Sequence, residues 1–137
     1  MIQARAVIKP VRILFVEDSE DILFLMTSEL QSMGYLVEVA RDGETGLQVA
    51  EKYQPELIIS DVQMPGISGL EFIHEIRNRP VLANIPAIAL SGFCSQSHID
   101  SVLTHGFTAH LVKPVTTDEL VALIYRLTEP EKRTRAS

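Results

Sequence analysis

Short apolar runs alternate with amphipathic stretches along this chain. A short apolar run bounded by glycine, proline or acidic residues is typical of a buried strand in a parallel sheet. Five such runs predict strands at residues 11–16, 36–40, 57–60, 86–91 and 108–112. The fourth run begins with Pro86, which is tolerated at the first position of a strand.

The stretches after these runs have apolar residues at intervals of three and four, which is typical of helices with one buried face. The predicted helices begin near residues 22, 43, 68, 95 and 116. Capping boxes mark two of these starts, Ser68 with Glu71 and Thr116 with Glu119. The helix predicted over 95–105 has the shortest and most polar pattern.

The regular alternation of five strands with five helices, joined by short loops, predicts an α/β fold. Parallel strands connected by right-handed crossovers form a sheet that is covered on both faces. With 137 residues the chain is long enough for one domain with a sizeable core. We expect residues 1–10 to be an N-terminal extension, 11–128 to be the domain and 129–137 to be a polar tail.

Composition narrows the class of protein. Hydrophobic residues make up 46% of the chain and charged residues 22%, as in soluble globular domains. The net charge of −6 argues against nucleic acid as a direct partner, because phosphate binding needs a basic surface. The single cysteine, Cys94, excludes an internal disulfide and suits a reducing compartment. Without a run of roughly 18 apolar residues or a signal peptide, we expect a cytoplasmic protein without a membrane span.

Asp61 stands where α/β folds carry their chemistry. It directly follows the buried run 57–60, and Pro65-Gly66 ends the segment. Ligands of open parallel sheets bind beyond the carboxyl ends of the strands. An aspartate in this place can also simply cap a turn, so the residue alone does not decide between the two interpretations.

Other strand ends supply polar residues to the same edge of the sheet. The first strand is followed by Glu17 and Asp18, the fourth ends at Ser91, and the fifth leads into Lys113. Carboxylates brought close together repel one another unless a cation lies between them, and Mg²⁺ prefers such oxygen ligands. Asp61 beside Mg²⁺ and a lysine would have the surroundings of a phosphoryl acceptor, since carboxylates can form aspartyl phosphates.

Each of these residues also has an ordinary structural explanation. Glu17 and Asp18 favour the positive end of the following helix. Ser91 suits a turn, and Lys113 suits an exposed surface. The occurrence of all of them at matching strand ends favours a shared site.

These polar residues lie in segments that resemble the receiver domain of two-component response regulators. The segments are Val16-Glu17-Asp18, Asp61-Val62-Gln63-Met64-Pro65-Gly66 through Gly69, Ser91-Gly92 and Lys113-Pro114. They occur in the order of that family, and the resemblance covers about residues 11–128. It implies a flavodoxin-like (βα)5 sheet with strand order 2-1-3-4-5. It also implies that Asp61 accepts a phosphoryl group from a phosphohistidine on a sensor histidine kinase or a histidine phosphotransfer protein.

The resemblance also implies which residues bind a metal ion and which tune the lifetime of the phosphoryl group. Asp18, Asp61 and the backbone carbonyl of Gln63 would bind Mg²⁺, and Glu17 would help through a water molecule. Gln63 and Phe93 match positions that tune the phosphoryl lifetime in this family. A bulky apolar Phe93 would shield the phosphoryl group from water.

Residues further along the chain would complete the switch. Lys113 and Ser91 would contact the phosphoryl group, and the Lys113–Pro114 bond would be cis, a minority state that places the lysine. His110 matches the switch aromatic, which is more often tyrosine or phenylalanine, and an imidazole would make the change sensitive to pH. The remaining histidines show no ligand spacing and are expected on the surface: His74, His98 and His105.

Three other functions fit parts of the pattern. A phosphatase of the haloacid dehalogenase type would need a second aspartate two residues after the nucleophile, where this chain has Gln63. A flavodoxin-like FMN carrier would need a loop rich in Ser, Thr and Gly after the first strand, where residues 17–21 are acidic. A phosphorylation-independent interaction module of the same fold is the remaining alternative.

Signal output is the part of the function that stays open at this point. No enzymatic activity is expected beyond the protein's own phosphorylation and dephosphorylation. We expect phosphorylation to switch a surface made of the last two helices and the fifth strand, for a downstream protein or a second copy of the chain. The domain could stand alone or be the receiver of a hybrid kinase.

Overall fold

A computed structural model describes residues 10–128, within which five strands alternate with five helices. The strands are β1 (Arg12–Val16), β2 (Leu36–Ala40), β3 (Leu57–Asp61), β4 (Ala87–Ser91) and β5 (Ala109–Val112). The helices are α1 (Glu20–Ser32), α2 (Gly43–Tyr53), α3 (Gly69–Arg77), α4 (Gln96–His105) and α5 (Thr117–Thr128). None of these helices is long and apolar enough to cross a membrane. The expected tail at 129–137, and nearly all of the expected extension at 1–10, lie outside the described residues.

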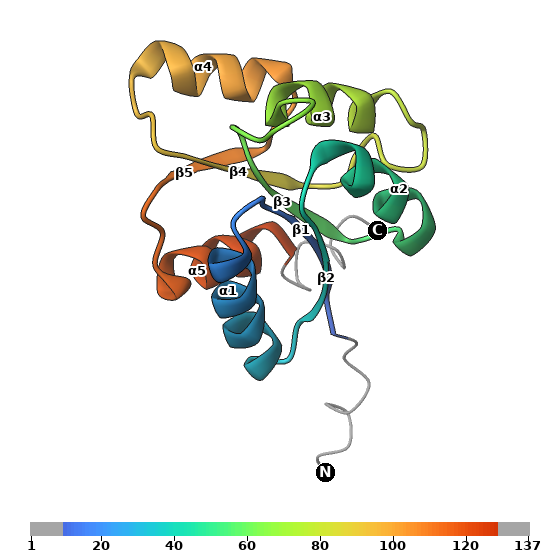
Figure 1. Cartoon of the computed structure of the whole chain (residues 1–137), viewed down its shortest axis with the longest axis vertical. Helices are drawn as coiled ribbons and strands as arrows, with labels where there is room; N and C mark the ends of the chain where they lie inside the picture. Colours follow the sequence, from blue (N-terminus) through green and yellow to red (C-terminus); the bar gives the residue numbers. More distant parts are fainter. Residues whose placement is uncertain (1–9, 129–137) are drawn as a thin grey trace.

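The strands form one parallel sheet in the order β2-β1-β3-β4-β5. Figure 1 shows α1 and α5 on one face of this sheet and α2, α3 and α4 on the other. Because every pair of strands is parallel, all carboxyl ends lie at the same edge. The predicted α/β class and the strand order 2-1-3-4-5 are confirmed.

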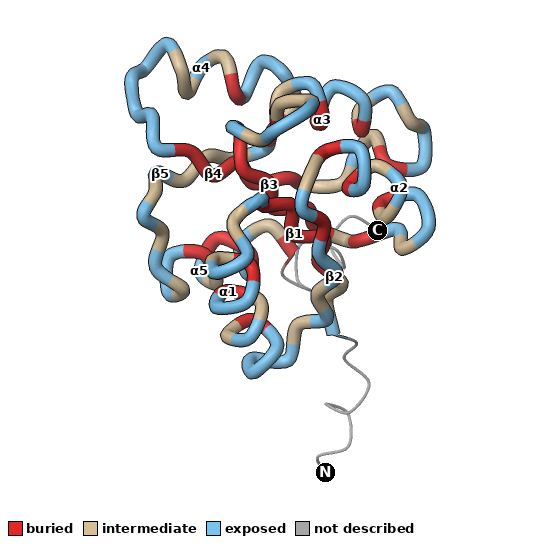
Figure 2. Tube along the Cα trace, in the orientation of Figure 1, coloured by how far each residue is buried: buried red, intermediate tan, exposed pale blue. Residues whose placement is uncertain are grey.

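Successive residues of the central strands enter two different hydrophobic cores. Leu14 and Val16 of β1 belong to the core under α2, α3 and α4, together with Phe72. Ile13 and Phe15 belong to the core under α1 and α5. Strands β3 and β4 are buried along their whole length, and Figure 2 shows this buried centre in red. Burial on both faces explains why these strands read as continuous apolar runs and holds their ends in place.

The helix boundaries follow the caps more closely than the apolar pattern. Helix α1 begins at Glu20, ahead of the predicted start at residue 22, because the Ser19 hydroxyl accepts the Ile22 N–H. Helix α3 begins with the predicted capping box, in which Ser68 and Glu71 each accept the other's backbone N–H.

Helix α4 forms where the shortest pattern predicted it, but little apolar surface attaches it to the core. Val102 is its one buried residue. Helix α3, which packs beside it, buries Phe72, Ile73 and Ile76 in addition to Gly69. With so few buried apolar side chains, α4 gains less stability from packing against the core than α3 does.

Candidate functional site

Three carboxylates meet at the carboxyl edge of the sheet. Asp61 ends β3, and Glu17 and Asp18 follow β1, which is the neighbouring strand. Each residue offers one oxygen, and these oxygens lie within 4.8 Å of one another. Glu17 and Asp61 are buried, with exposed fractions of 1% and 5%. A cluster of hard oxygen ligands of this kind can hold a small divalent cation such as Mg²⁺.

Backbone amides orient two of these carboxylates. The Ser19 N–H donates to Oε2 of Glu17 at 3.1 Å, and the Gln63 N–H donates to Oδ1 of Asp61 at 3.2 Å. Both amides belong to the loops that leave the strand ends. The turn after each strand therefore positions the carboxylate that precedes it.

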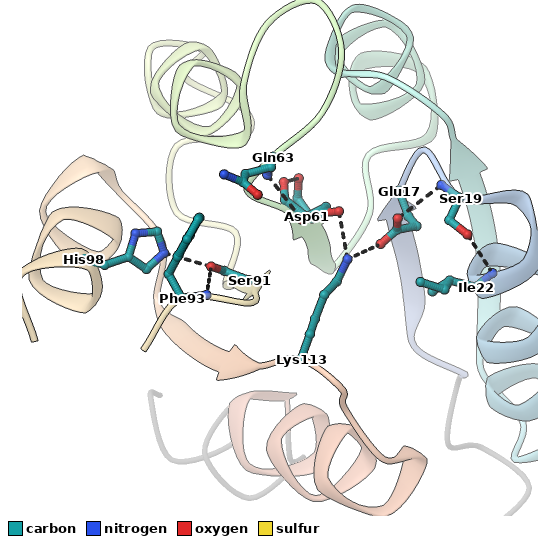
Figure 3. Close-up of polar contacts among 10 residues, drawn as sticks. Glu17, Ser19, Ile22, Asp61, Gln63, Ser91, Phe93, His98 and Lys113 are labelled. Carbon is teal, nitrogen blue, oxygen red and sulfur yellow. Dashed lines mark hydrogen bonds and ion pairs between the residues drawn. The ribbon is translucent and has the colours of Figure 1, made fainter. Parts of the chain in front are cut away.

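The ammonium group of Lys113 lies between two of the carboxylates, as Figure 3 shows. Its Nζ is 2.9 Å from Oδ2 of Asp61 and 3.2 Å from Oε1 of Glu17. The Lys113 N–H donates to the Ser91 carbonyl at 2.8 Å, so β4 also positions the lysine. The Lys113–Pro114 peptide bond is cis.

Burial and neighbouring charges shift the protonation of this cluster. Burial, together with the charge of Asp61, raises the pKa of Glu17 above its ordinary value. Burial by itself would lower the pKa of Lys113, but its hydrogen bonds and charge interactions with Asp61 and Glu17 raise this pKa overall. Lys113 is therefore charged at neutral pH, and the three carboxylates outnumber it. The excess negative charge favours a further cation at this edge.

Ser91 belongs to a second group of side chains beside the carboxylates. Its Oγ accepts the Phe93 N–H at 3.0 Å and lies 2.9 Å from Nε2 of His98. In Figure 3 this hydroxyl turns toward His98 and away from Asp61. Within residues 10–128, no side-chain hydrogen bond joins Ser91 to Asp61 or Lys113. The predicted hydroxyl donor is thus near the carboxylate cluster but engaged elsewhere.

His98 differs from the surface position predicted for it. It is partly buried, whereas His74 and His105 are exposed as predicted. Its ring lies between two other rings, with centroids 5.4 Å from Phe93 and 5.6 Å from His110, both in edge-on geometry. The sequence signal that could have indicated this position is the place of His98 in the first turn of α4, the helix that follows Ser91.

His110 lies on β5, opposite Ala89 of β4. Its Nε2 is buried and has no hydrogen-bond partner. Burial, together with the nearby His98, lowers the pKa of His110 below its ordinary value of 6.5. The imidazole at the predicted switch position is therefore held as a neutral ring at neutral pH.

The two positions expected to tune the phosphoryl lifetime lie at the rim of the site. Gln63 is exposed and follows Asp61 on the loop after β3. Phe93 is also exposed, at 50%, and its ring packs edge-on against His98. Both side chains can therefore meet solvent at this edge of the sheet.

Comparison with known proteins agrees with this arrangement. Residues 13–125 match the family described as the response regulator receiver domain. The polar-differentiation response regulator DivK of Brucella anthropi is 29% identical over 115 residues, which cover 84% of this chain and 94% of DivK. The chemotaxis response regulator CheY4 of Vibrio cholerae superposes with a TM-score of 0.84 at 32% identity, covering 88% of this chain and all of CheY4.

A second similar structure comes from a sensor histidine kinase. The receiver domain of the sensor histidine kinase PA1611 from Pseudomonas aeruginosa has a TM-score of 0.80 at 29% identity, covering 86% of this chain and 97% of that domain. That structure holds a magnesium ion coordinated in its active-site cleft. The fold, the carboxylate cluster and the match over nearly the whole described region lead to one conclusion. The chain belongs to the response regulator receiver domain family.

Proposed function

We propose that this protein is a phosphoryl-accepting receiver in two-component signalling and that Asp61 is the acceptor. The observation that carries the proposal is the grouping of Asp61 with Glu17, Asp18 and Lys113 at the carboxyl edge of the sheet. The donor is a phosphohistidine on a sensor histidine kinase or a histidine phosphotransfer protein. We also propose that the protein is cytoplasmic.

The transfer exchanges one bond to phosphorus for another. A carboxylate oxygen of Asp61 forms the new P–O bond, and the P–N bond of the phosphohistidine breaks with its electron pair left on the imidazole. Lys113, which contacts Oδ2 of Asp61, neutralises charge on the incoming group. The Ser91 hydroxyl supplies a hydrogen-bond donor to the same group after it turns from His98.

The same residues suit a magnesium cofactor. Glu17, Asp18 and Asp61 would hold the ion. By resemblance to the family, the backbone carbonyl of Gln63 would be a further ligand. Mg²⁺ held there would supply positive charge to offset the negative charge of a phosphoryl group. The excess of carboxylate over ammonium charge supports this assignment, as does the magnesium ion in the related receiver of PA1611.

Output is proposed to pass through α4, β5 and α5. Each of these elements exposes one large apolar side chain, namely Leu103, Val112 and Tyr125. Such side chains give a partner protein apolar surface to bury on docking. A downstream protein or a second copy of this chain would bind here when Asp61 is phosphorylated.

Intact mass spectrometry tests the acceptor. The wild type and Asp61→Ala are incubated with Mg²⁺ and acetyl phosphate, and the wild type is also incubated with a chelator. We expect the mass gain of one phosphoryl group only in the wild type with Mg²⁺. A gain in Asp61→Ala would show that another residue is the acceptor. No gain in the wild type, with acetyl phosphate or with candidate kinases, would favour the phosphorylation-independent interaction module.

A further inference from the structure

The hydroxyl group of Ser91 already has a partner on α4. His98 Nε2 lies 2.9 Å from Ser91 Oγ, which is a normal hydrogen-bond distance. The same oxygen accepts the Phe93 N–H at 3.0 Å. Ser91 itself is buried, with 2% of its surface exposed, so bulk water cannot easily replace these contacts. Turning the hydroxyl toward Asp61 therefore costs an existing hydrogen bond.

The ring of His98 is fixed on two sides by aromatic contacts. Phe93 packs against it from the loop after β4, and His110 packs against it from β5. The two imidazole rings meet edge-on, and the buried Nε2 of His110 has no hydrogen-bond partner. One side chain of α4 thus connects the hydroxyl residue of β4 with the ring at the switch position of β5.

We infer that His98 is a positioning residue that holds the Ser91 hydroxyl on the α4 side, in competition with a phosphoryl group on Asp61. When Ser91 turns to the phosphoryl group, His98 loses this hydrogen bond while its ring still contacts Phe93 and His110. The state of Asp61 is thereby transmitted to α4 and β5 through a single imidazole. The inference rests on the proposed role of Asp61 as acceptor.

Two substitutions separate the hydrogen bond from the ring contacts. His98→Phe keeps an aromatic ring between Phe93 and His110 but cannot bond to Ser91. His98→Gln can place a polar atom near the position of Nε2 and restores a partner for the hydroxyl. We measure the affinity of the full chain for beryllofluoride, a phosphoryl mimic, in the presence of Mg²⁺ by ¹⁹F NMR titration.

The proposed competition predicts that the affinity for beryllofluoride rises when the hydrogen bond between His98 and Ser91 is removed. Losing one competing hydrogen bond in the unphosphorylated state should tighten beryllofluoride binding of His98→Phe by about threefold to tenfold. His98→Gln should bind within about twofold of the wild type. In a Ser91→Ala background, His98→Phe should not tighten beryllofluoride binding, because there is no hydroxyl group for His98 and the phosphoryl mimic to compete for. A merely structural role of His98 would change the affinity equally in both backgrounds.

The outcomes distinguish this inference from the proposed function. If the wild type binds beryllofluoride and His98→Phe binds it with the same affinity, the proposed role of His98 is overturned. The acceptor role of Asp61 is then unaffected. Absence of binding by the wild type overturns the acceptor role of Asp61 and the competition with it. A further measurement needs no His98 variant. The ¹⁵N shift of His98 Nε2 should change on Ser91→Ala, and an unchanged shift would mean that the hydrogen bond is absent in solution.

Discussion

Lys113 links the charges of the site at the scale of single residues. It touches both buried carboxylates, Glu17 and Asp61, and its raised pKa shows that these contacts outweigh the cost of its burial. Without the ammonium group, the two carboxylates would repel each other in a site that water reaches poorly. The lysine therefore stabilises the resting site as well as the proposed phosphorylated one.

His110 predicts a pH dependence of stability. Because burial lowers its pKa in the folded state, the unfolded chain binds a proton first as the pH falls below 6.5. The free energy of unfolding should therefore decrease as the pH falls from 6.5 to the lower pKa that His110 has in the folded state. His110→Phe should lose this part of the decrease in denaturant unfolding at a series of pH values.

His74→Phe is the matched control for this prediction, because His74 is exposed. Its unfolding free energy should follow the wild-type pH dependence. If His110→Phe also kept the wild-type dependence across this window, the neutral buried state of His110 would be ruled out.

At the scale of elements, α3 starts in close contact with the strand that carries Asp61. The Gly69 N–H donates to the Val62 carbonyl at 2.7 Å. A Cβ at Gly69 would lie 2.3 Å from the Asp61 carbonyl oxygen and 2.6 Å from the Val62 Cα. Both contacts are with backbone atoms, which cannot move aside by a change of rotamer. Only glycine fits where the helix approaches the strand end.

We therefore expect Gly69→Ala to destabilise the fold by about 1–3 kcal/mol, as for other overpacked sites. Gly92→Ala is the control, because a Cβ there has no neighbour within 4 Å. Its stability should stay within about 0.5 kcal/mol of the wild type. Urea unfolding measures both values, and equal stabilities of the two variants would contradict the backbone clash.

The elements themselves were largely predictable, and the reason is burial. Strands such as β3 are buried on both faces and leave an unbroken apolar run, while caps such as Ser68 with Glu71 mark helix starts. The start of α1 was missed because Ser19 begins the helix with an acidic turn before the apolar pattern. The carboxylates and Lys113 could be grouped because parallel strand ends share one edge.

The role of His98 could not be predicted in the same way. Its contact with Ser91 depends on how α4 lies across β4 and β5, and neither periodicity nor spacing defines that angle. The polar pattern of α4 hid the partly buried ring among exposed residues. The contacts of a helix with few buried residues therefore follow from its orientation in the fold and cannot be predicted from its sequence pattern.

At the scale of the whole molecule, the sheet separates two cores and gathers negative charge at one edge. The chain has a net charge of −6, and three of its carboxylates are crowded at the candidate site. A cation that binds only the folded protein stabilises it by mass action. Mg²⁺ should therefore act on global stability as well as on phosphorylation.

We expect Mg²⁺ to raise the free energy of unfolding of the wild type, by about 2.7 kcal/mol when its concentration is about a hundred times the dissociation constant. Asp18→Asn should lose most of this gain. Asp21→Asn changes a nearby acidic residue outside the cluster and should keep it. Thermal unfolding with and without Mg²⁺ measures the effect, and an equal gain in both variants would place the ion elsewhere.

The ion pairs of Lys113 join distant parts of the sequence. Lys113 is separated by 96 residues from Glu17 and by 52 residues from Asp61. A polypeptide that is still being synthesised, or is cleaved before Lys113, cannot form this arrangement even when β1 and β3 have already paired. The proposed phosphoryl-accepting site is therefore completed late, when the last strand docks.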